Sequence, residues 1–144
     1  MTQTTTPATE TPEAGVRTLV EEYADAMRAA DAGRLAACHQ PGAEVFDLAP
    51  PLRKTFDVEG MRAWFAGHGG GPLGYEIRDL AVTAGAEVAY AHCLTRMYAP
   101  GFELWFRTSY GLRRADGRWL IAHVHESTPF HMDGSLRAAT DLTP

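Results

Sequence analysis

The chain has 144 residues, of which 45% are hydrophobic and 10% aromatic, enough for one domain with a substantial core and too few for two. A formal net charge of -5 and the lack of any Lys/Arg cluster exclude nucleic-acid binding through a basic surface. Cys38 and Cys93 stand alone, without the spacing of a zinc site or a disulfide framework. With no signal peptide and no membrane-spanning apolar run, we expect a cytoplasmic protein without nucleic-acid or membrane partners.

Three helices are predicted in the first half of the chain. Residues 1–14, rich in Thr and Pro, are expected to form a disordered leader. From Val16 to Ala30, apolar residues recur at helical spacing with charged residues opposite, which predicts an amphipathic helix. A second, short helix is expected from Arg34 to His39. Asp57 can cap a third helix, with an apolar stripe of Met61, Trp64 and Phe65.

Residues 43–51 combine a short buried strand with one carboxylate, Asp47, among apolar neighbours. Burial disfavours the charged form of a carboxyl and raises its pKa toward neutrality, as a general base acting on a carbon acid requires. The alternative is that Asp47 caps the Pro-rich loop that follows the strand, since turns commonly use Asp.

From Tyr75 onward the apolar period changes to two, which predicts a meander of long strands with turns between them. The strands are expected at Tyr75–Ala84, Val88–Tyr98, Phe102–Arg114 and Trp119–Ser127. Helices followed by such a meander predict an α+β fold, a cone whose strongly curved antiparallel sheet wraps the N-terminal helices. We expect one domain over residues 15–132, a C-terminal tail over 133–144, and a small-molecule site at the open end of the cone.

Four short segments accompany this order of elements: Asp31-Ala32-Gly33, Val45-Phe46-Asp47, residues 111–119 and His123-Val124-His125-Glu126-Ser127. With them, the chain resembles the nuclear transport factor 2-like superfamily, specifically its SnoaL-like and ketosteroid isomerase-like members, which share a cystatin-like cone. The resemblance covers nearly the whole chain from Val16. The superfamily includes isomerases, cyclases, dehydratases, epoxide hydrolases and non-catalytic binding or oligomerising domains, so the site must decide the activity.

The resemblance implies roles for single residues. In ketosteroid isomerase a strand-borne Asp at the position of Asp47 shuttles the proton. The two oxyanion donors of that enzyme correspond to Ala26 and Ser109 here, so neither donor is kept. Tyr23, one turn before Ala26, and the Ser109 hydroxyl are the candidates to replace them.

The lining of the cone depends on strand register. If Ser109 lies inside, a period of two places the following residues inside as well: Trp105, Arg107, Gly111, Tyr90, His92, Leu94, Ala122, Val124 and Glu126. The outer face then carries Trp119, Ile121, His123 and His125, where relatives of this fold usually pair, so we expect a homodimer through the sheet. A slip of one residue would exchange the two sets.

Each candidate has a structural alternative. His92 is either a core histidine or a proton shuttle, and Arg107 either pairs with Glu126 or binds an anionic group of a substrate. Two histidines at i and i+2 could bind a metal, but a third ligand would be needed, so we expect no metal and no cofactor. The aromatic side chains of Trp64, Tyr90 and Trp105 are expected to shape the pocket.

Two functions follow from these candidates. The first is a cofactor-free acid/base enzyme, of isomerase, cyclase or dehydratase type, acting on a small apolar carbonyl or polyketide-like compound. Asp47 would move the proton, His92 or Tyr23 would polarise the carbonyl, and Ser109, Arg107 and Glu126 would orient the substrate. The second is a non-catalytic small-ligand-binding or dimerisation domain, like the association domain of calmodulin-dependent kinases. The pocket arginines of that domain correspond here to His92, Ser109 and Glu126.

Overall fold

The structure is a computed structural model that describes residues 10–144, so most of the predicted leader lies outside the described residues. Helix α1 spans Pro12–Arg28 and begins four residues earlier than the apolar pattern predicts. Thr11 explains the early start, because its hydroxyl accepts a hydrogen bond from the Ala14 amide, and Pro12 suits the first turn of a helix.

Helices α2 (Ala32–Cys38) and α3 (Val58–Gly67) confirm the other two predicted helices. Each begins after an Asp N-cap, Asp31 or Asp57. Helix α2 ends one residue earlier than predicted, because the next residue is extended and opens strand β1 (His39–Phe46). A short strand β2 (Lys54–Thr55) was not predicted.

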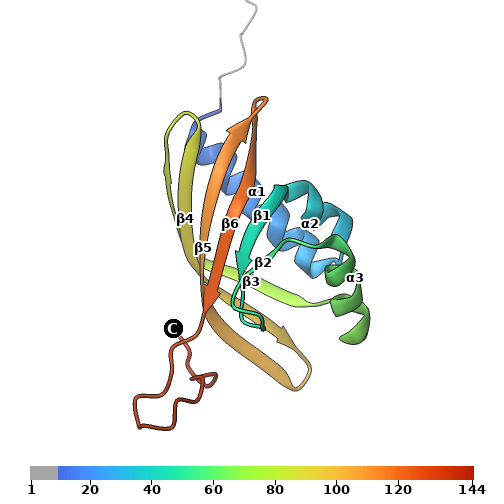
Figure 1. Cartoon of the computed structure of the whole chain (residues 1–144), viewed down its shortest axis with the longest axis vertical. Helices are drawn as coiled ribbons and strands as arrows, with labels where there is room; N and C mark the ends of the chain where they lie inside the picture. Colours follow the sequence, from blue (N-terminus) through green and yellow to red (C-terminus); the bar gives the residue numbers. More distant parts are fainter. Residues whose placement is uncertain (1–9) are drawn as a thin grey trace, which may run out of the picture.

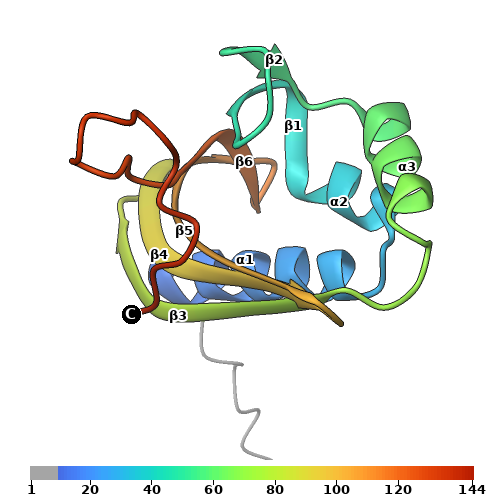
Figure 2. The same ribbon diagram turned by 90° about the horizontal axis from the view of Figure 1, so that it is seen from below.

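The four predicted long strands are confirmed as β3 (Gly74–Ala84), β4 (Val88–Ala99), β5 (Phe102–Ala115) and β6 (Arg118–Ser127). Together the strands form one sheet in the order β2-β1-β6-β5-β4-β3, antiparallel except where β1 runs parallel to β6 (Figure 1). Figure 2 shows this strongly curved sheet curling around α1, with α2 and α3 alongside. The α+β cone is therefore confirmed.

The predicted register of β4 and β5 is wrong by one residue. His92 pairs with Ser109 across the two strands, and both residues are exposed. The positions that face the core are the alternate ones: Ala89, Ala91, Cys93, Thr95, Phe106, Thr108, Tyr110 and Leu112. In β5 these positions carry the more apolar set of side chains, so burying them stabilises the fold more than burying Arg107 and Ser109 would.

Strand β6 changes face at a bulge. Its pairing with β5 shifts between Gly111 and Leu112, which leaves one extra residue, Ala122, in β6. Ala122 is half-buried rather than directed into the cone. Before the bulge, Trp119 and Ile121 are buried, although the sequence predicted them on the outer face.

After the bulge the predicted orientation holds. Val124 and Glu126 face the inside of the cone. His123 and His125 lie on the other side of the strand, where both rings contact Phe46 edge to face. Beyond β6, residues 128–144 fold into a loop closed by a bridge between Phe130 and Ala138. Among the described residues no helix is long and apolar enough to cross a membrane.

Candidate functional site

A cavity of about 350 Å³ lies on the concave side of the sheet, and we name it the Glu126 cavity. Helices α1 and α3, the β1–β2 region and strands β3 to β6 all contribute to its wall. Most of the wall is apolar, with side chains such as Met27, Val45, Phe56, Met61, Trp64, Met97, Phe106 and Val124. Its polar side chains are few, as is usual for a small-molecule site: Tyr23, His39, Asp47, Lys54, Thr55, Asp57, Tyr75 and Glu126.

One carboxyl of this cavity belongs to Glu126. Burial, and then the nearby charge of Asp47, raise its pKa to about 7, while Lys54 opposes both effects. Glu126 is half-buried and lines the cavity, so a ligand can reach its carboxyl. Near neutral pH such a group can both accept and donate a proton.

Asp47 lies next to Glu126 in a different environment. It follows the last residue of β1, and its Oδ1 accepts a hydrogen bond from the Ala49 amide at 2.9 Å. Its Oδ2 lies 2.9 Å from Nζ of Lys54, the single lysine of the chain. Asp47 therefore caps the loop, as the alternative prediction stated, and lines the cavity as well.

Three tyrosines gather beside these charged groups. The ring of Tyr23, from α1, lies 6.1 Å from that of Tyr75 and 5.9 Å from that of Tyr110. Burial, and then the charge of Glu126, raise the pKa of Tyr23, so its phenol stays protonated and can donate a hydrogen bond. Within residues 10–144, the buried hydroxyls of Tyr75 and Tyr110 have no hydrogen-bond partner. Tyr23 and Tyr75 line the cavity, so a ligand oxygen there would meet two phenol hydroxyls that can donate.

His39 also lines the cavity, a position that the sequence analysis missed. Its Nδ1 lies 2.6 Å from the Leu35 carbonyl, so Nδ1 carries the proton and Nε2 is left as an acceptor. Burial lowers the pKa of His39, and its ring stacks on Phe56 at 3.9 Å. Pro41 is the signal in the sequence that the helix ends near this residue. The residue before a proline avoids the helical conformation, so the chain is expected to become extended there.

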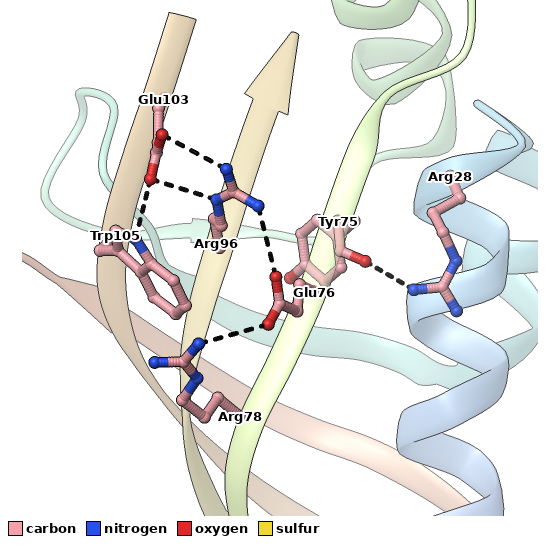
Figure 3. Close-up of polar contacts among 7 residues, drawn as sticks. All are labelled: Arg28, Tyr75, Glu76, Arg78, Arg96, Glu103 and Trp105. Carbon is pink, nitrogen blue, oxygen red and sulfur yellow. Dashed lines mark hydrogen bonds and ion pairs between the residues drawn. The ribbon is translucent and has the colours of Figure 1, made fainter. Parts of the chain in front are cut away.

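Five predicted site residues lie away from this cavity, on the outer face of the sheet: Tyr90, His92, Trp105, Arg107 and Ser109. Arg107 is exposed and donates to Ser127 Oγ at 3.2 Å, so the predicted pair with Glu126 is wrong. Trp105 donates to Glu103 and lies under Arg78 in the ion-pair cluster of Figure 3. These placements follow from the corrected register.

In the described part of the chain, no three His, Cys, Asp or Glu side chains lie close enough together to hold a metal ion. His123 uses its Nδ1 to contact the Glu44 carbonyl at 3.0 Å. That the protein works without metal or cofactor remains a prediction.

Comparisons with known proteins agree with this architecture. A family model described as a SnoaL-like domain matches residues 16–131. A nuclear transport factor 2-like protein of unknown function from Pseudomonas putida is 29% identical, with a TM-score of 0.79 over 92% of this chain and 96% of that chain. A search of curated proteins finds no match.

Two more distant solved structures share the fold. One, from Novosphingobium aromaticivorans, is called a "putative scytalone dehydratase"; it is 16% identical, with a TM-score of 0.67 over 88% of this chain and 89% of that chain. The other, from Streptomyces avermitilis, is called a "putative dehydratase" of the nuclear transport factor 2-like family; it is 14% identical, with a TM-score of 0.68 over 81% and 95%.

Proposed function

Because the chain belongs to the SnoaL-like domain family, on a nuclear transport factor 2-like fold, we propose that it is a cofactor-free acid/base enzyme. Its substrate is a small apolar carbonyl compound bound in the Glu126 cavity. One observation carries this proposal: a carboxyl with a pKa of about 7 shares an apolar cavity with the protonated phenol of Tyr23.

The chemistry begins with proton abstraction. The Glu126 carboxylate takes a proton from the carbon next to the substrate carbonyl. The electron pair of that C–H bond forms a carbon–carbon double bond, and the π pair of the carbonyl moves onto its oxygen. The Tyr23 hydroxyl donates a hydrogen bond to the oxygen and stabilises its developing charge. Asp47 and Lys54 set the charge around Glu126, so they are positioning residues in this scheme.

The second step decides the reaction class. If the Glu126 carboxylic acid returns its proton to a different carbon, the net reaction is an isomerisation. If it protonates a hydroxyl on the next carbon, the carbonyl re-forms, a double bond forms between the two carbons and the C–O bond breaks. The products are an α,β-unsaturated carbonyl compound and water, and the net reaction is a dehydration. We favour dehydration, because two proteins of the same fold are called "putative dehydratase" or "putative scytalone dehydratase", and we retain a polyketide-like compound as the proposed substrate.

Proton exchange tests the proposal without knowledge of the natural substrate. Cyclohexenone is incubated with the protein in deuterium oxide, and NMR follows the protons next to the carbonyl. We expect exchange above the buffer rate, since enolisation is reversible and puts solvent deuterium on the carbon. Binding of the ketone without faster exchange would favour the alternative, a non-catalytic ligand-binding domain.

Asp47 and Lys54 should shift the pH profile of this exchange in opposite directions. Asp47→Asn removes a charge that raises the pKa of Glu126, while its amide oxygen can still accept from Ala49; Lys54→Met removes a charge that lowers that pKa. We expect the midpoint of the exchange rate to fall in the first variant and rise in the second, each by roughly one pH unit or less. Equal midpoints in both variants would contradict the coupling.

We also propose that two copies pair through the outer face of the sheet. Val88 and Tyr90 are 62% and 57% exposed there, and Leu94 and Trp105 are half-buried farther along the same face. Light scattering should give twice the 15.7 kDa of one chain, and Tyr90→Asp should shift the mass toward the monomer. A monomer at micromolar concentration in the unsubstituted protein would refute the dimer.

A cytoplasmic location is proposed as well, in keeping with the free thiols of Cys38 and Cys93.

A further inference from the structure

A second cavity of about 630 Å³ adjoins the Glu126 cavity, and we name it the Leu104 cavity. It lies between the end of α3, the loop that follows α3, and the β4–β5 hairpin, which Figures 1 and 2 show on the same side of the molecule. Four residues line both cavities: Leu48, Ala49, Trp64 and Met97. The two cavities therefore lie next to each other and share part of their wall.

The two cavities differ in chemistry. The Leu104 cavity is lined, within the described residues, by no Asp, Glu, Lys or Arg. Its one titratable side chain, His68, uses Nδ1 to contact the Trp64 carbonyl at 2.7 Å, and its ring lies 4.4 Å from the Trp64 ring. The remaining wall is apolar or backbone, with Phe102 and Leu104 from β5. The three carboxylates that line either cavity, and Lys54, lie in the wall of the Glu126 cavity.

We propose that the Leu104 cavity binds an uncharged apolar extension of the molecule whose carbonyl lies beside Glu126. This inference rests on the proposed function, and it narrows the substrate class to elongated compounds with an apolar part remote from the carbonyl. A free carboxylate or phosphate on that remote part is disfavoured, because none of the described residues that line the cavity is a Lys or Arg that could pair with it.

Size supports an elongated ligand. Sites for drug-sized molecules occupy roughly 300 to 1,000 Å³, and the Glu126 cavity alone, at about 350 Å³, is near the lower limit. The flat faces of Trp64 and His68 also suit a ring, since offset stacking is favourable between aromatic groups. Binding energy from the remote part can then hold the carbonyl in position for proton transfer.

Matched ligands and matched variants test the inference. Dissociation constants are measured for cyclohexenone and for a phenylcyclohexenone that carries its ring opposite the carbonyl. We expect the phenyl compound to bind roughly ten- to a hundredfold more tightly. Ala99→Trp should fill the Leu104 cavity and remove that advantage, while cyclohexenone affinity and exchange stay unchanged. Ala86→Trp, in the exposed β3–β4 turn, is the control.

A second variant covers the case in which Ala99→Trp does not fold. Leu104→Gln keeps the approximate volume and adds a polar amide, so it should also weaken only the phenyl compound. An unchanged preference for the phenyl compound in both variants would overturn the inference.

The proposed function can fail separately. Absence of proton exchange, together with a phenyl preference that Ala99→Trp removes, would refute the enzyme and keep the two-cavity ligand. Exchange that requires Glu126, together with equal affinity for both ketones, would keep the enzyme and refute the extension site.

Discussion

Replacing Glu126 with Gln should lower the rate of cyclohexenone proton exchange by about a hundredfold or more, the usual contribution of a general base. Gln has nearly the shape of Glu and cannot accept a proton from carbon. The apolar wall and Tyr23 remain, so the affinity for the ketone should change little. NMR exchange rates and a binding isotherm for the same preparation measure both effects.

Glu21→Gln provides the matched control, because Glu21 is an exposed carboxylate on α1, in the helix that also supplies Tyr23. Its exchange rate should equal that of the unsubstituted protein. A Glu126→Gln protein that keeps its full rate would assign the base to another group, with Asp47 and His39 as the remaining candidates in the cavity.

The same substitution should change how stability depends on pH. The pKa of Glu126 rises from 4.5, the ordinary value of a solvated glutamate, to about 7 in the fold, so between these pH values the native state binds more protons than the unfolded chain. Stability from this group is therefore fully present below about pH 4.5 and is lost as the pH rises through 7. Above that range the buried charge costs about 2 kcal/mol, after allowance for water in the cavity.

Gln carries no charge at any pH, so Glu126→Gln should be about 2 kcal/mol more stable than the unsubstituted protein at about pH 8, and nearly equal to it at about pH 4. Urea unfolding at the two pH values measures the difference, and the comparison cancels the contributions of the other carboxylates. A difference in stability that is the same at both pH values would show that Glu126 titrates normally.

The order of elements could be predicted because local signals act within a few residues. Asp57 caps α3 by accepting a single hydrogen bond from the Glu59 amide, and the two residues are close neighbours in the sequence. Asp116 and Gly117 adopt positive φ in the hairpin between β5 and β6, as an Asp-Gly pair predicts. Strand β2 could not be predicted, since it is two residues long and exists only through its pairing with β1.

The inner face of the sheet could be predicted only in part. On β5, the resemblance of Ser109 to a donor of ketosteroid isomerase predicted the wrong inner face. The alternation of Phe106, Tyr110 and Leu112 by itself indicates the correct buried face. On β6, a bulge reverses the alternation at Ala122, and nothing in the local sequence marks it.

The residues of the candidate site could also be predicted only in part. The sequence placed Tyr23 and Glu126 toward the cavity, and the structure has both in its wall. It assigned the raised carboxyl pKa to Asp47, whereas burial raises the pKa of Glu126. Strand pairing explains the difference: β1 lies beside β6 and is joined to β2, so Lys54 forms an ion pair with Asp47, while Glu126 forms none within the described residues. Such long-range neighbours are set by the sheet.

The most direct measurement of the central claim is the titration of the Glu126 carboxyl itself. Carbon-13 NMR of protein labelled at the glutamate side-chain carbonyl, with Glu126→Gln to assign the resonance, follows that carboxyl through the pH range. The account predicts a midpoint of about 7. A midpoint at the ordinary value of 4.5 would contradict it, because a fully ionised Glu126 could not act as the acid of the second step at neutral pH.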